Sequence, residues 1–423
     1  MNKSNLLENS QSALKKLYGP SEDIIKRQNN RYKQLLDNFE ETFDHSAEAL
    51  FSSPGRTEIS GNHTDHNKGK VLAASIDLDT IAAVRKISGR IRIKSKGFEP
   101  LFEIEIDDLE RRADESGTTT ALMRGIASRF QQLGFDVGGF EAYLSSQVGV
   151  GSGLSSSASI EVLIGMILNQ FYNSGQLDAI QIAKIGQYAE NEYFAKPCGL
   201  MDQLSIAAGG VLEIDFKDEQ PVVKETHFDQ KKAGIDIVIV DTGGNHADLT
   251  DDYASIPEEM QAVAHQFDQE VCRGLEMSEV LNNIDSLREQ VSDRAILRCI
   301  HFLRENQRVD NLLSAIDRDN YDQFLEIIRQ SGDSSFKYLQ NCYPAHAPDE
   351  QGVSLALALT EYFIEEKGCK GACRVHGGGF AGTIQTFIDT EFCQEYVDFI
   401  EEIFEEGATT RIKIRKSGVI QIK

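Results

Sequence analysis

The sequence predicts an α+β protein with room for two domains. The chain has 423 residues, 40% of them hydrophobic and 26% charged, which is typical of a globular protein with ample core. Between residues 77 and 148, apolar residues alternate with charged ones, as in half-buried antiparallel strands. Between residues 252 and 332, the apolar spacing is helical instead.

The first third of the chain contains a helical segment, several strands and one further helix. Residues 1–50 are polar and helical in pattern, and we expect a surface lead-in without a chemical role; its apolar positions are Leu6, Leu7, Leu17, Leu35, Leu36 and Phe39. Apolar residues mark three predicted strands: Ile91 and Ile93; Phe102, Ile104 and Ile106; Phe140, Ala142 and Leu144. A helix is predicted over 120–133.

The later segments alternate between strand and helix patterns. Strands are predicted over 210–216 and 235–240, and the region 252–332 is expected to be largely helical. Residues 371–382 carry four glycines in six positions, which indicates either a strained hairpin or a backbone that a ligand approaches closely. The last residues predict a strand hairpin with Gly418 at its turn.

Charge and composition exclude several classes of partner. A net charge of −24 argues against nucleic acid and against an anionic membrane surface. No run of about 18 apolar residues predicts a transmembrane helix, and the N-terminus lacks an apolar signal core. The seven cysteines form no paired Cys-x-x-Cys motif, which is typical of reduced thiols, so we expect a cytoplasmic protein.

A glycine- and serine-rich stretch, Val148–Ser159, precedes an apolar run at helical spacing. It admits two interpretations: a glycine turn with a serine as helix N-cap, or a phosphate site formed by free backbone N–H groups at a helix N-terminus. Six Gly or Ser residues in nine positions favour the phosphate site. The stretch lacks the Gly-Lys-[Ser/Thr] of a Walker A loop and the last glycine of the dinucleotide fingerprint.

Polar residues crowd between 54 and 76, where His63, Asp65 and His66 follow Arg56. The cluster is consistent with a metal site, a hydrogen-bonded turn or a polyol site. We rate the turn above the metal because no zinc-type spacing is completed elsewhere. We prefer the polyol site because an arginine and a phosphate loop occur in the same chain.

Two carboxylates near Pro197 also have alternative roles. Asp202 is either a helix cap or a catalytic base. Glu190 is either a solvated glutamate or a metal ligand.

Together these pieces resemble the galactokinase branch of the GHMP small-molecule kinases, from about Ser53 to Gly382. Five motifs in order carry the resemblance: Pro54-Gly55-Arg56 with Gly61-Asn62-His63-Thr64-Asp65; the loop Gly151–Ser159; Gly199-Leu200-Met201-Asp202-Gln203; His246 followed by Tyr253; and Gly377-Gly378-Gly379-Phe380. The resemblance implies a two-domain GHMP kinase fold, with a ribosomal-protein-S5-like N-terminal domain and an active site in the cleft. It places the N-terminal domain at 1–203, completed by strands in 409–423, and the C-terminal domain at 204–408.

The resemblance also implies the roles of individual residues. Asp202 faces the anomeric hydroxyl of the sugar, and Arg56 stabilises the transferring phosphoryl group. The ATP phosphates are bound by Gly151, Ser152, Gly153, Leu154, Ser155, Ser156 and Ser157. Ser157 and Glu190 hold Mg²⁺. The sugar pocket is lined by Asn62, His63, Thr64, Asp65 and Tyr253. ATP and a small sugar are the expected partners, and the protein is expected to be a monomer or a weak homo-oligomer.

Departures from the family pattern concern the sugar. Asn62 replaces a Glu, His66 replaces a Tyr, and His376 and Ala381 replace a Thr and a Gly. We expect D-galactose to be phosphorylated at C1. A C6-modified relative such as D-galacturonate is the alternative, because Asn62 removes a charge that would repel a carboxylate. A sugar- and ATP-binding sensor without turnover is a third possibility, which the intact loop and Asp202 argue against.

Overall fold

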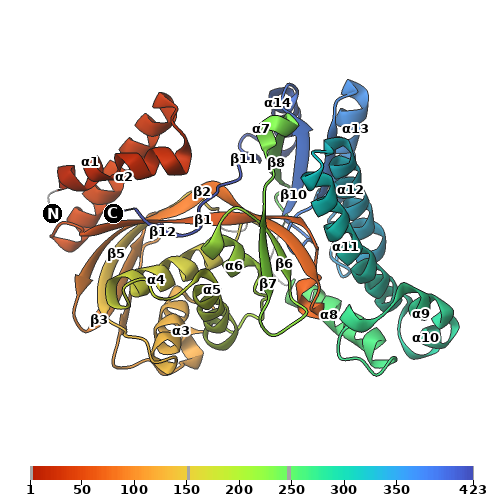
Figure 1. Ribbon diagram of the computed structural model, residues 1–423, viewed down its shortest axis with the longest axis horizontal. Coiled ribbons are helices and arrows are strands. Elements are labelled where there is room, and N and C mark those ends of the chain that lie inside the picture. Colours follow the sequence, from red (N-terminus) through yellow and green to blue (C-terminus); the bar gives the residue numbers. More distant parts are fainter. Residues whose placement is uncertain (1–2, 150–152, 245–248, 423) are drawn as a thin grey trace.

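The computed structural model describes residues 3–149, 153–244 and 249–422, and within them two β-sheets carry helical layers (Figure 1). The first sheet has the order β12-β1-β2-β5-β3-β4, and β6 and β7 extend it from β2. The second sheet has the order β11-β8-β10-β9. The strands of the first sheet are β1 (Ala49–Ser60), β2 (Lys70–Ile87), β3 (Arg90–Ser95), β4 (Leu101–Glu105), β5 (Gly139–Ser146), β6 (Val211–Asp215), β7 (Val222–Thr226) and β12 (Ile420–Gln421). Those of the second are β8 (Ile235–Asp241), β9 (Gly371–Val375), β10 (Thr383–Asp389) and β11 (Thr409–Ile412).

The helices group with the two sheets. Those near the first sheet are α1 (Lys3–Tyr18), α2 (Glu22–Phe43), α3 (Thr119–Gln132), α4 (Ser156–Tyr172), α5 (Ala179–Tyr188), the π-helical turn η3 (Ala189–Phe194) and α6 (Met201–Ala208). Those of the second half are α7 (Gln230–Ala233), α8 (Thr250–His265), α9 (Met277–Asn282), α10 (Ile284–Gln290), α11 (Asp293–Asp317), α12 (Tyr321–Ser334), the π-helical turn η5 (Ser335–Leu339), α13 (Gly352–Lys367) and α14 (Cys393–Phe404). Short 3₁₀ turns lie at η1 (Asp65–Asn67), η2 (Ala113–Glu115) and η4 (Cys272–Gly274). No helix within the described ranges is long and apolar enough to cross a bilayer.

Both faces of the first sheet are covered. Helices α3, α4 and α5 lie on one side, and α1 and α2 lie on the other (Figure 1). The core between α3, α4 and the sheet contains Phe130, Phe140 and Leu163. The strand predictions between 77 and 148 are confirmed, but the expectation that all these strands are antiparallel is wrong. β3 pairs with β5 in parallel, because the chain passes through β4 and α3 before it returns beside β3.

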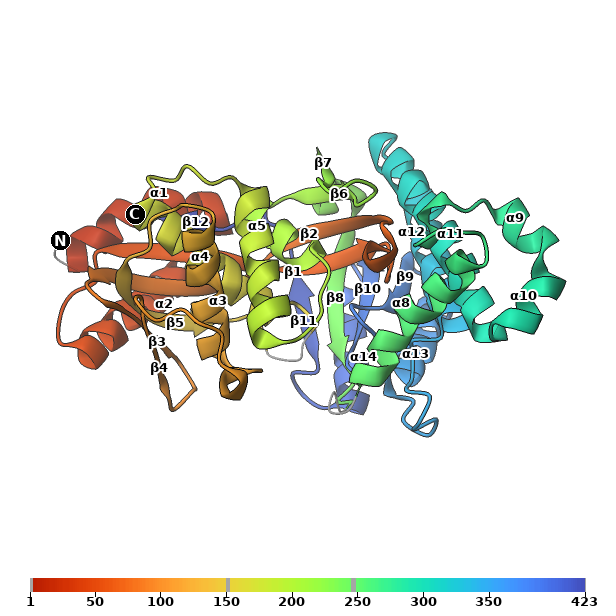
Figure 2. The same ribbon diagram turned by 90° about the horizontal axis from the view of Figure 1, so that it is seen from below.

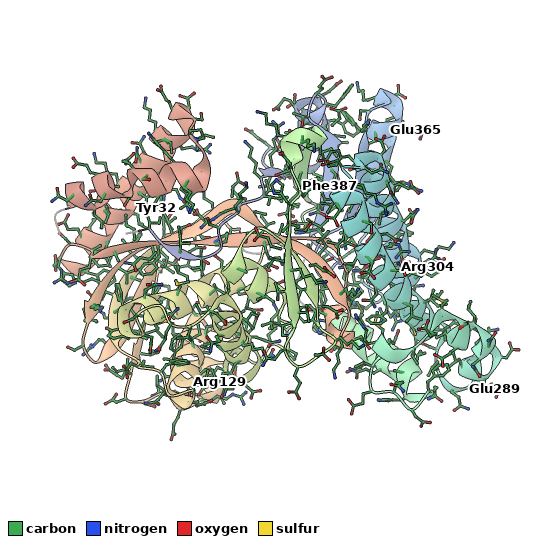
Figure 3. The ribbon with its side chains drawn as sticks, viewed as in Figure 1. Tyr32, Arg129, Glu289, Arg304, Glu365 and Phe387 are labelled. Atoms are coloured by element: carbon green, nitrogen blue, oxygen red, sulfur yellow. The ribbon has the colours of Figure 1, made fainter. Side chains whose placement is uncertain are left out.

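The N-terminal lead-in is helical as expected, but the expectation of a surface segment is wrong. Leu35, Leu36 and Phe39 are buried and pack with Leu50 and Ile81 of the sheet. The reason is that the first sheet has two apolar faces, and α1 and α2 cover the second one. Tyr32 lies inside this layer, whereas Arg129 lies on the surface of α3 (Figure 3).

The predicted C-terminal hairpin does not form. β11 pairs with β8 in the second sheet, and β12 pairs with β1 in the first, so residues 413–419 cross from one sheet to the other. Gly418 lies where a Cβ would come within 2.2 Å of the Ala207 carbonyl oxygen, so it permits a close crossing rather than a hairpin turn. The alternation of apolar residues identifies strands, but it does not identify their partners.

The second half of the molecule has β8 in the middle of its sheet, and helices α8 to α11 extend away from it (Figure 2). The predicted helical region is confirmed by α8 to α12. Phe387 of β10 is fully buried between the sheet and α12. The glycine-rich segment 371–382 forms β9 and the loop 376–382 that leads to β10. Because β6 and β7 extend the first sheet, the division of the chain at residue 203 stays a prediction.

Candidate active site

The centre of the candidate site is an ion pair between Arg56 and Asp202. Arg56 Nε donates to Asp202 Oδ1 at 2.7 Å, and Nη2 donates to Oδ2 at 2.9 Å. The remaining nitrogen, Nη1, donates to the carbonyl oxygen of Gly153. The Arg56 side chain is 7% exposed and that of Asp202 is 31% exposed, so the arginine is fixed and the carboxylate still faces solvent.

Local backbone features position the two charges. β1 has register shifts on either side of Arg56, between Pro54 and Arg56 and between Glu58 and Ser60. Such bulges re-aim a side chain out of the regular alternation. Asp202 lies in the first turn of α6, where the helix dipole stabilises a negative charge.

The electrostatics favour an ionised Asp202. Burial alone would raise its pKa, but the Arg56 guanidinium and a hydrogen bond from the Ser155 hydroxyl hold the pKa below its usual value. The carboxylate is therefore charged at neutral pH. It is suited to accepting a hydrogen bond and to holding Arg56 in place.

The described part of the predicted phosphate loop lies directly against this pair. Gly151 and Ser152 fall outside the described residues. Gly153 has φ +70°, and a Cβ there would lie 2.5 Å from Thr383 Oγ1, so only glycine fits. Leu154 is buried, and its carbonyl oxygen accepts a hydrogen bond from the backbone N–H of Arg56 at 3.1 Å.

Ser155 precedes α4 in a left-handed conformation, with φ 61°, and makes no side-chain cap to the helix. The hydroxyls of Ser156 and Ser157 are half-buried in the first turn. Backbone N–H groups at such a helix start are suited to binding an anion. The helix N-cap interpretation of the serines is thus not what the described geometry supports.

The predicted metal ligands lie near a buried acidic pair. Gln203 Nε2 donates to Glu190 Oε2 at 2.8 Å and to Glu161 Oε2 at 3.0 Å. Glu161 lies one helical turn after Ser157 on α4, so the two side chains share a face. Burial raises the pKa of Glu190, and burial and the nearby Glu190 raise the pKa of Glu161.

The donor set fits a divalent cation. Within the described residues, Glu161 Oε1 and Gln203 Oε1 are buried without a hydrogen-bond partner. Oxygen donors around two carboxylates suit Mg²⁺, and a cation there would offset the repulsion between the acids. Ser157 and Glu190 stay predicted ligands; Glu161 is a residue that the sequence reasoning missed, although its spacing of four from Ser157 was a signal.

The predicted sugar-binding residues fall into two groups. Asp65 packs against Gly199 of the Asp202 motif, where an added Cβ would lie 1.8 Å from Asp65 Oδ2. His63 Nε2 bonds to the carbonyl oxygen of Gly378 at 2.8 Å, and its ring stacks on Tyr253 at 6.5 Å between centroids. These three side chains therefore gather near Asp202 and the glycine-rich loop. His246, in the same motif as Tyr253, lies outside the described residues.

Asn62 and Thr64 belong to the second group, because both are fully buried. Asn62 Nδ2 donates to the carbonyl oxygen of Gly377 at 2.7 Å and to Glu58 Oε1 at 3.1 Å. Its Oδ1 accepts from Asn341 at 2.8 Å. The Thr64 hydroxyl is within hydrogen-bond distance of two backbone carbonyls. A sugar would have to displace these bonds to reach either side chain.

Two further buried residues, Arg374 and His376, bind side chains of β1, and the sequence reasoning assigned neither of them a role in the site. Arg374 Nη2 donates to Glu58 at 2.7 Å. His376 bonds Thr57 Oγ1 at 3.0 Å, and burial together with Arg56 lowers its pKa well below the usual value. The sequence marks His376 only as a departure from the family pattern and does not single out Arg374, because the burial of both depends on contacts between distant segments.

Comparisons with known proteins bear on the fold and on the family motifs. Two family models match the sequence: the galactokinase galactose-binding signature over residues 37–86, and the GHMP kinases N terminal domain over residues 121–210. The crystal structure of Lactococcus lactis galactokinase complexed with galactose is similar over 92% of this chain and 98% of its own, with a TM-score of 0.79 and 23% identity. The Methanococcus jannaschii mevalonate kinase is similar over 87% of this chain and 98% of its own, with a TM-score of 0.61 and 16% identity. These likenesses confirm the fold that the motifs predict.

Proposed function

We propose that this chain, which has the GHMP kinase fold and carries the galactokinase signature, transfers the γ-phosphoryl group of ATP to the C1 hydroxyl of D-galactose. The observation that carries the proposal is the ion pair between Arg56 and Asp202, bound to Gly153 and Ser155 at the start of α4. An arginine, an ionised carboxylate and a helix N-terminus in contact are the parts that phosphoryl transfer needs.

Each group has a defined task in this proposal. The N-terminus of α4 and its serines hold the ATP phosphates, and Arg56 offsets the negative charge that spreads over the transferring group. Asp202 accepts a hydrogen bond from the attacking sugar hydroxyl and orients it. Its lowered pKa makes it a weak base before transfer begins, so orientation is its main task, and Asp202 accepts the hydroxyl proton only as the bond from the sugar oxygen to phosphorus forms. A Mg²⁺ ion held by Ser157 and Glu190, with Glu161 behind them, supplies further charge neutralisation when bound.

D-galactose is the first candidate because the matched signature is a galactose-binding one and because the similar Lactococcus lactis enzyme was crystallised with galactose. Asp65, His63 and Tyr253 are the side chains proposed to contact the sugar. D-galacturonate is the second candidate. The observation in its favour is that Asn62 is uncharged and that Glu58 beside it is already neutralised by Arg374.

The test is a coupled assay of ADP release with Mg·ATP and a panel of hexoses and hexuronic acids. We expect sugar-dependent turnover with galactose at the head of the panel, and a product in which C1 carries the phosphate by ³¹P NMR. Turnover led by galacturonate would select the second candidate. Sugar-dependent ATP binding without turnover on any sugar would favour the sensor and would contradict the proposal.

A further inference from the structure

A hollow region outside the candidate active site lies where the two sheets adjoin. It consists of two neighbouring cavities of about 650 and 690 Å³ that share Asp236, Thr390, Lys413 and Ile414 in their walls. We call this region the rear cavity. None of the residues assigned above to sugar, phosphate or metal lines it. Each part has the size of a small-molecule site, roughly 300–1,000 Å³.

The charge of the rear cavity departs from that of the whole chain. The protein has a net charge of −24. The cavity walls nevertheless contain six cationic and four anionic side chains. The cationic ones are Arg27, Lys231, Arg411, Lys413, Arg415 and Lys416. Four of the six come from the segment 411–416, which passes between the sheets.

Most of the acidic side chains are already engaged. Asp236 pairs with Arg411 at 2.9 Å, and Asp77 accepts the backbone N–H of Lys413 at 2.8 Å. Asp229 caps α7 by accepting the backbone N–H of Lys232 at 3.0 Å. Of the four acids, only Glu225 makes no hydrogen bond or ion pair with the described residues.

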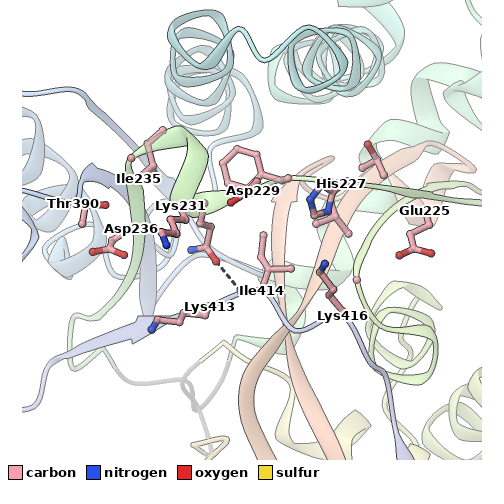
Figure 4. Close-up of a pocket in the computed structure, with 16 residues that line it drawn as sticks. Glu225, His227, Asp229, Lys231, Ile235, Asp236, Thr390, Lys413, Ile414 and Lys416 are labelled. Atoms are coloured by element: carbon pink, nitrogen blue, oxygen red, sulfur yellow. Dashed lines mark hydrogen bonds between the residues drawn. The ribbon is translucent and has the colours of Figure 1, made fainter. Parts of the chain in front are cut away.

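Four of the cationic side chains are by contrast unpaired within the described residues, although the positive charge of Lys413 acts on the nearby Asp77 carboxylate. Arg27, Lys231, Lys413 and Lys416 are exposed, and their side chains form no hydrogen bond or ion pair within the described part of the chain. Because the six cationic side chains outnumber the four acidic ones, the walls carry a formal net charge of +2 in a chain whose net charge is −24. Figure 4 shows how these groups lie: Lys231 and Lys413 are on one side of Ile414, and Lys416 is near His227 and Glu225 on the other.

The walls also offer apolar surface. Phe228 and Ile235 are buried at one part of the cavity, and Leu17 is buried at the other. Ammonium groups bind phosphate oxygens as point charges, while the apolar walls suit a carbon skeleton or a ring. We propose that the rear cavity is a second binding site, for a phosphorylated small molecule, with Lys413 as its central phosphate-binding residue.

The test measures binding with the candidate active site saturated by galactose and a non-hydrolysable Mg·ATP analogue. Glycerol 3-phosphate and AMP are the probes, and glycerol and adenosine are their uncharged counterparts. By isothermal titration calorimetry, we expect the phosphorylated probes to bind and the uncharged counterparts to bind at least tenfold more weakly. Affinity should fall with added salt, because exposed charges are screened.

Substitutions of Lys413 test whether the phosphorylated probes bind in the rear cavity. Lys413→Gln should weaken binding of the phosphorylated probe at least tenfold, and Lys413→Arg should retain it. Lys232→Gln is the matched control, because Lys232 neighbours Lys231 on α7 but pairs with Asp319 outside the cavity. The proposal is overturned if the phosphorylated probes do not bind, if their uncharged counterparts bind equally well, or if Lys413→Gln binds like the wild type. All of these measurements are of binding and none is of kinase activity. Their outcome therefore does not depend on which sugar the protein phosphorylates.

Discussion

Arg56 and Asp202 are separated by 146 positions in the chain, yet they share two hydrogen bonds. The pair is most sensitive to the loss of Asp202, because the charge of Arg56 would then stay buried without its partner. The pair also joins three elements, since Arg56 comes from β1, Asp202 from α6, and both contact the loop before α4. A change at either residue is therefore expected to act on chemistry and stability together.

The first prediction concerns the charge of Asp202. Asp202→Asn keeps the shape of the side chain but removes the charge that holds Arg56 and is proposed to orient the sugar hydroxyl. We expect kcat to fall by about a hundredfold or more, with a small change in sugar KM. Steady-state kinetics of the purified variant measure this, with Asp322→Asn on the exposed face of α12 as the control. A kcat equal to that of the wild type would rule out the role of Asp202.

The second prediction concerns the buried contact between Asn62 and Glu58. Asn62→Glu would place a second carboxylate beside Glu58 in a fully buried position. We expect the free energy of unfolding to fall by roughly 2 kcal/mol or more. The double variant Glu58→Gln/Asn62→Glu carries a single carboxylate, so it should be more stable than the sum of the two single effects predicts.

Urea unfolding of the wild type, both single variants and the double variant completes this cycle. Strictly additive effects would show that the two side chains are not coupled. The cycle also bears on sugar preference. If Asn62→Glu changes the preferred sugar, the repulsion between Glu58 and the new carboxylate is one cause, and a contact between residue 62 and C6 of the sugar is the other.

The sequence names some residues of the candidate site and misses others for a clear reason. Arg56 and Asp202 stand in short motifs with glycine and proline, which mark special backbone positions. Glu58 and Arg374 also lie within three residues of a glycine, but none of the five motifs includes Glu58, Arg374 or Glu161. Charged residues in strands and helices are usually solvated, and only the packing of distant segments buries these three.

Among the elements, the N-terminal helices are more tightly bound to the sheet than their polar sequence suggests. Asp79 of β2 is fully buried and pairs with Arg31 of α2 at 2.5 Å and with Arg415 at 3.1 Å. It also accepts hydrogen bonds from Tyr18 and Ser52. Burial alone would raise the pKa of Asp79, but these cationic and hydroxyl partners hold it below its usual value.

The third prediction tests this anchor. Arg31→Met removes one of the two cations that neutralise Asp79, so we expect the free energy of unfolding to fall by about 3 kcal/mol. Lys33→Met is the control, because Lys33 lies two positions further along α2 and is exposed. Chemical denaturation followed by circular dichroism gives both values. If the free energy of unfolding falls equally in both variants, the Arg31–Asp79 ion pair contributes no more to stability than the exposed Lys33 does.

The periodicity of the sequence predicts which residues form an element but not what the element pairs with. The helix over 120–133 and the strand over 235–240 are confirmed within one or two residues. The parallel pairing of β3 with β5 and the split of β11 and β12 between two sheets were not foreseen. Strand pairing depends on connections and twist over the whole chain, which local spacing does not encode.

At the scale of the molecule, buried histidines and buried glutamates make opposite contributions to the change in stability as the pH falls. His63, His301 and His376 are neutral in the fold: burial lowers the pKa of each, that of His63 to about 3. The unfolded chain binds their protons below about pH 6.5, so the stability that they contribute falls as the pH falls through that value. Glu161 and Glu190 have raised pKa values, so their contribution changes in the opposite direction.

The fourth prediction isolates one histidine from this balance. In His376→Gln, the free energy of unfolding should fall less steeply between pH 6.5 and 5.5 than in the wild type, by up to about 1.4 kcal/mol per pH unit. Urea unfolding at several pH values measures the two slopes. His227→Gln, at an exposed position, serves as the control for replacing a histidine. Equal slopes for the wild type and His376→Gln would mean that His376 is not held neutral by the fold.

The crossing of residues 413–419 between the sheets has a consequence for the order in which the protein is made. A ribosome delivers β1 near the start of synthesis, but its partner β12 and the Arg415 that neutralises Asp79 arrive only after almost every other element. Until then, the nascent N-terminal half has an open strand edge and an incompletely paired buried carboxylate. Open edges pair readily with other chains. The half-made protein is therefore expected to depend on chaperones until residue 421 leaves the exit tunnel.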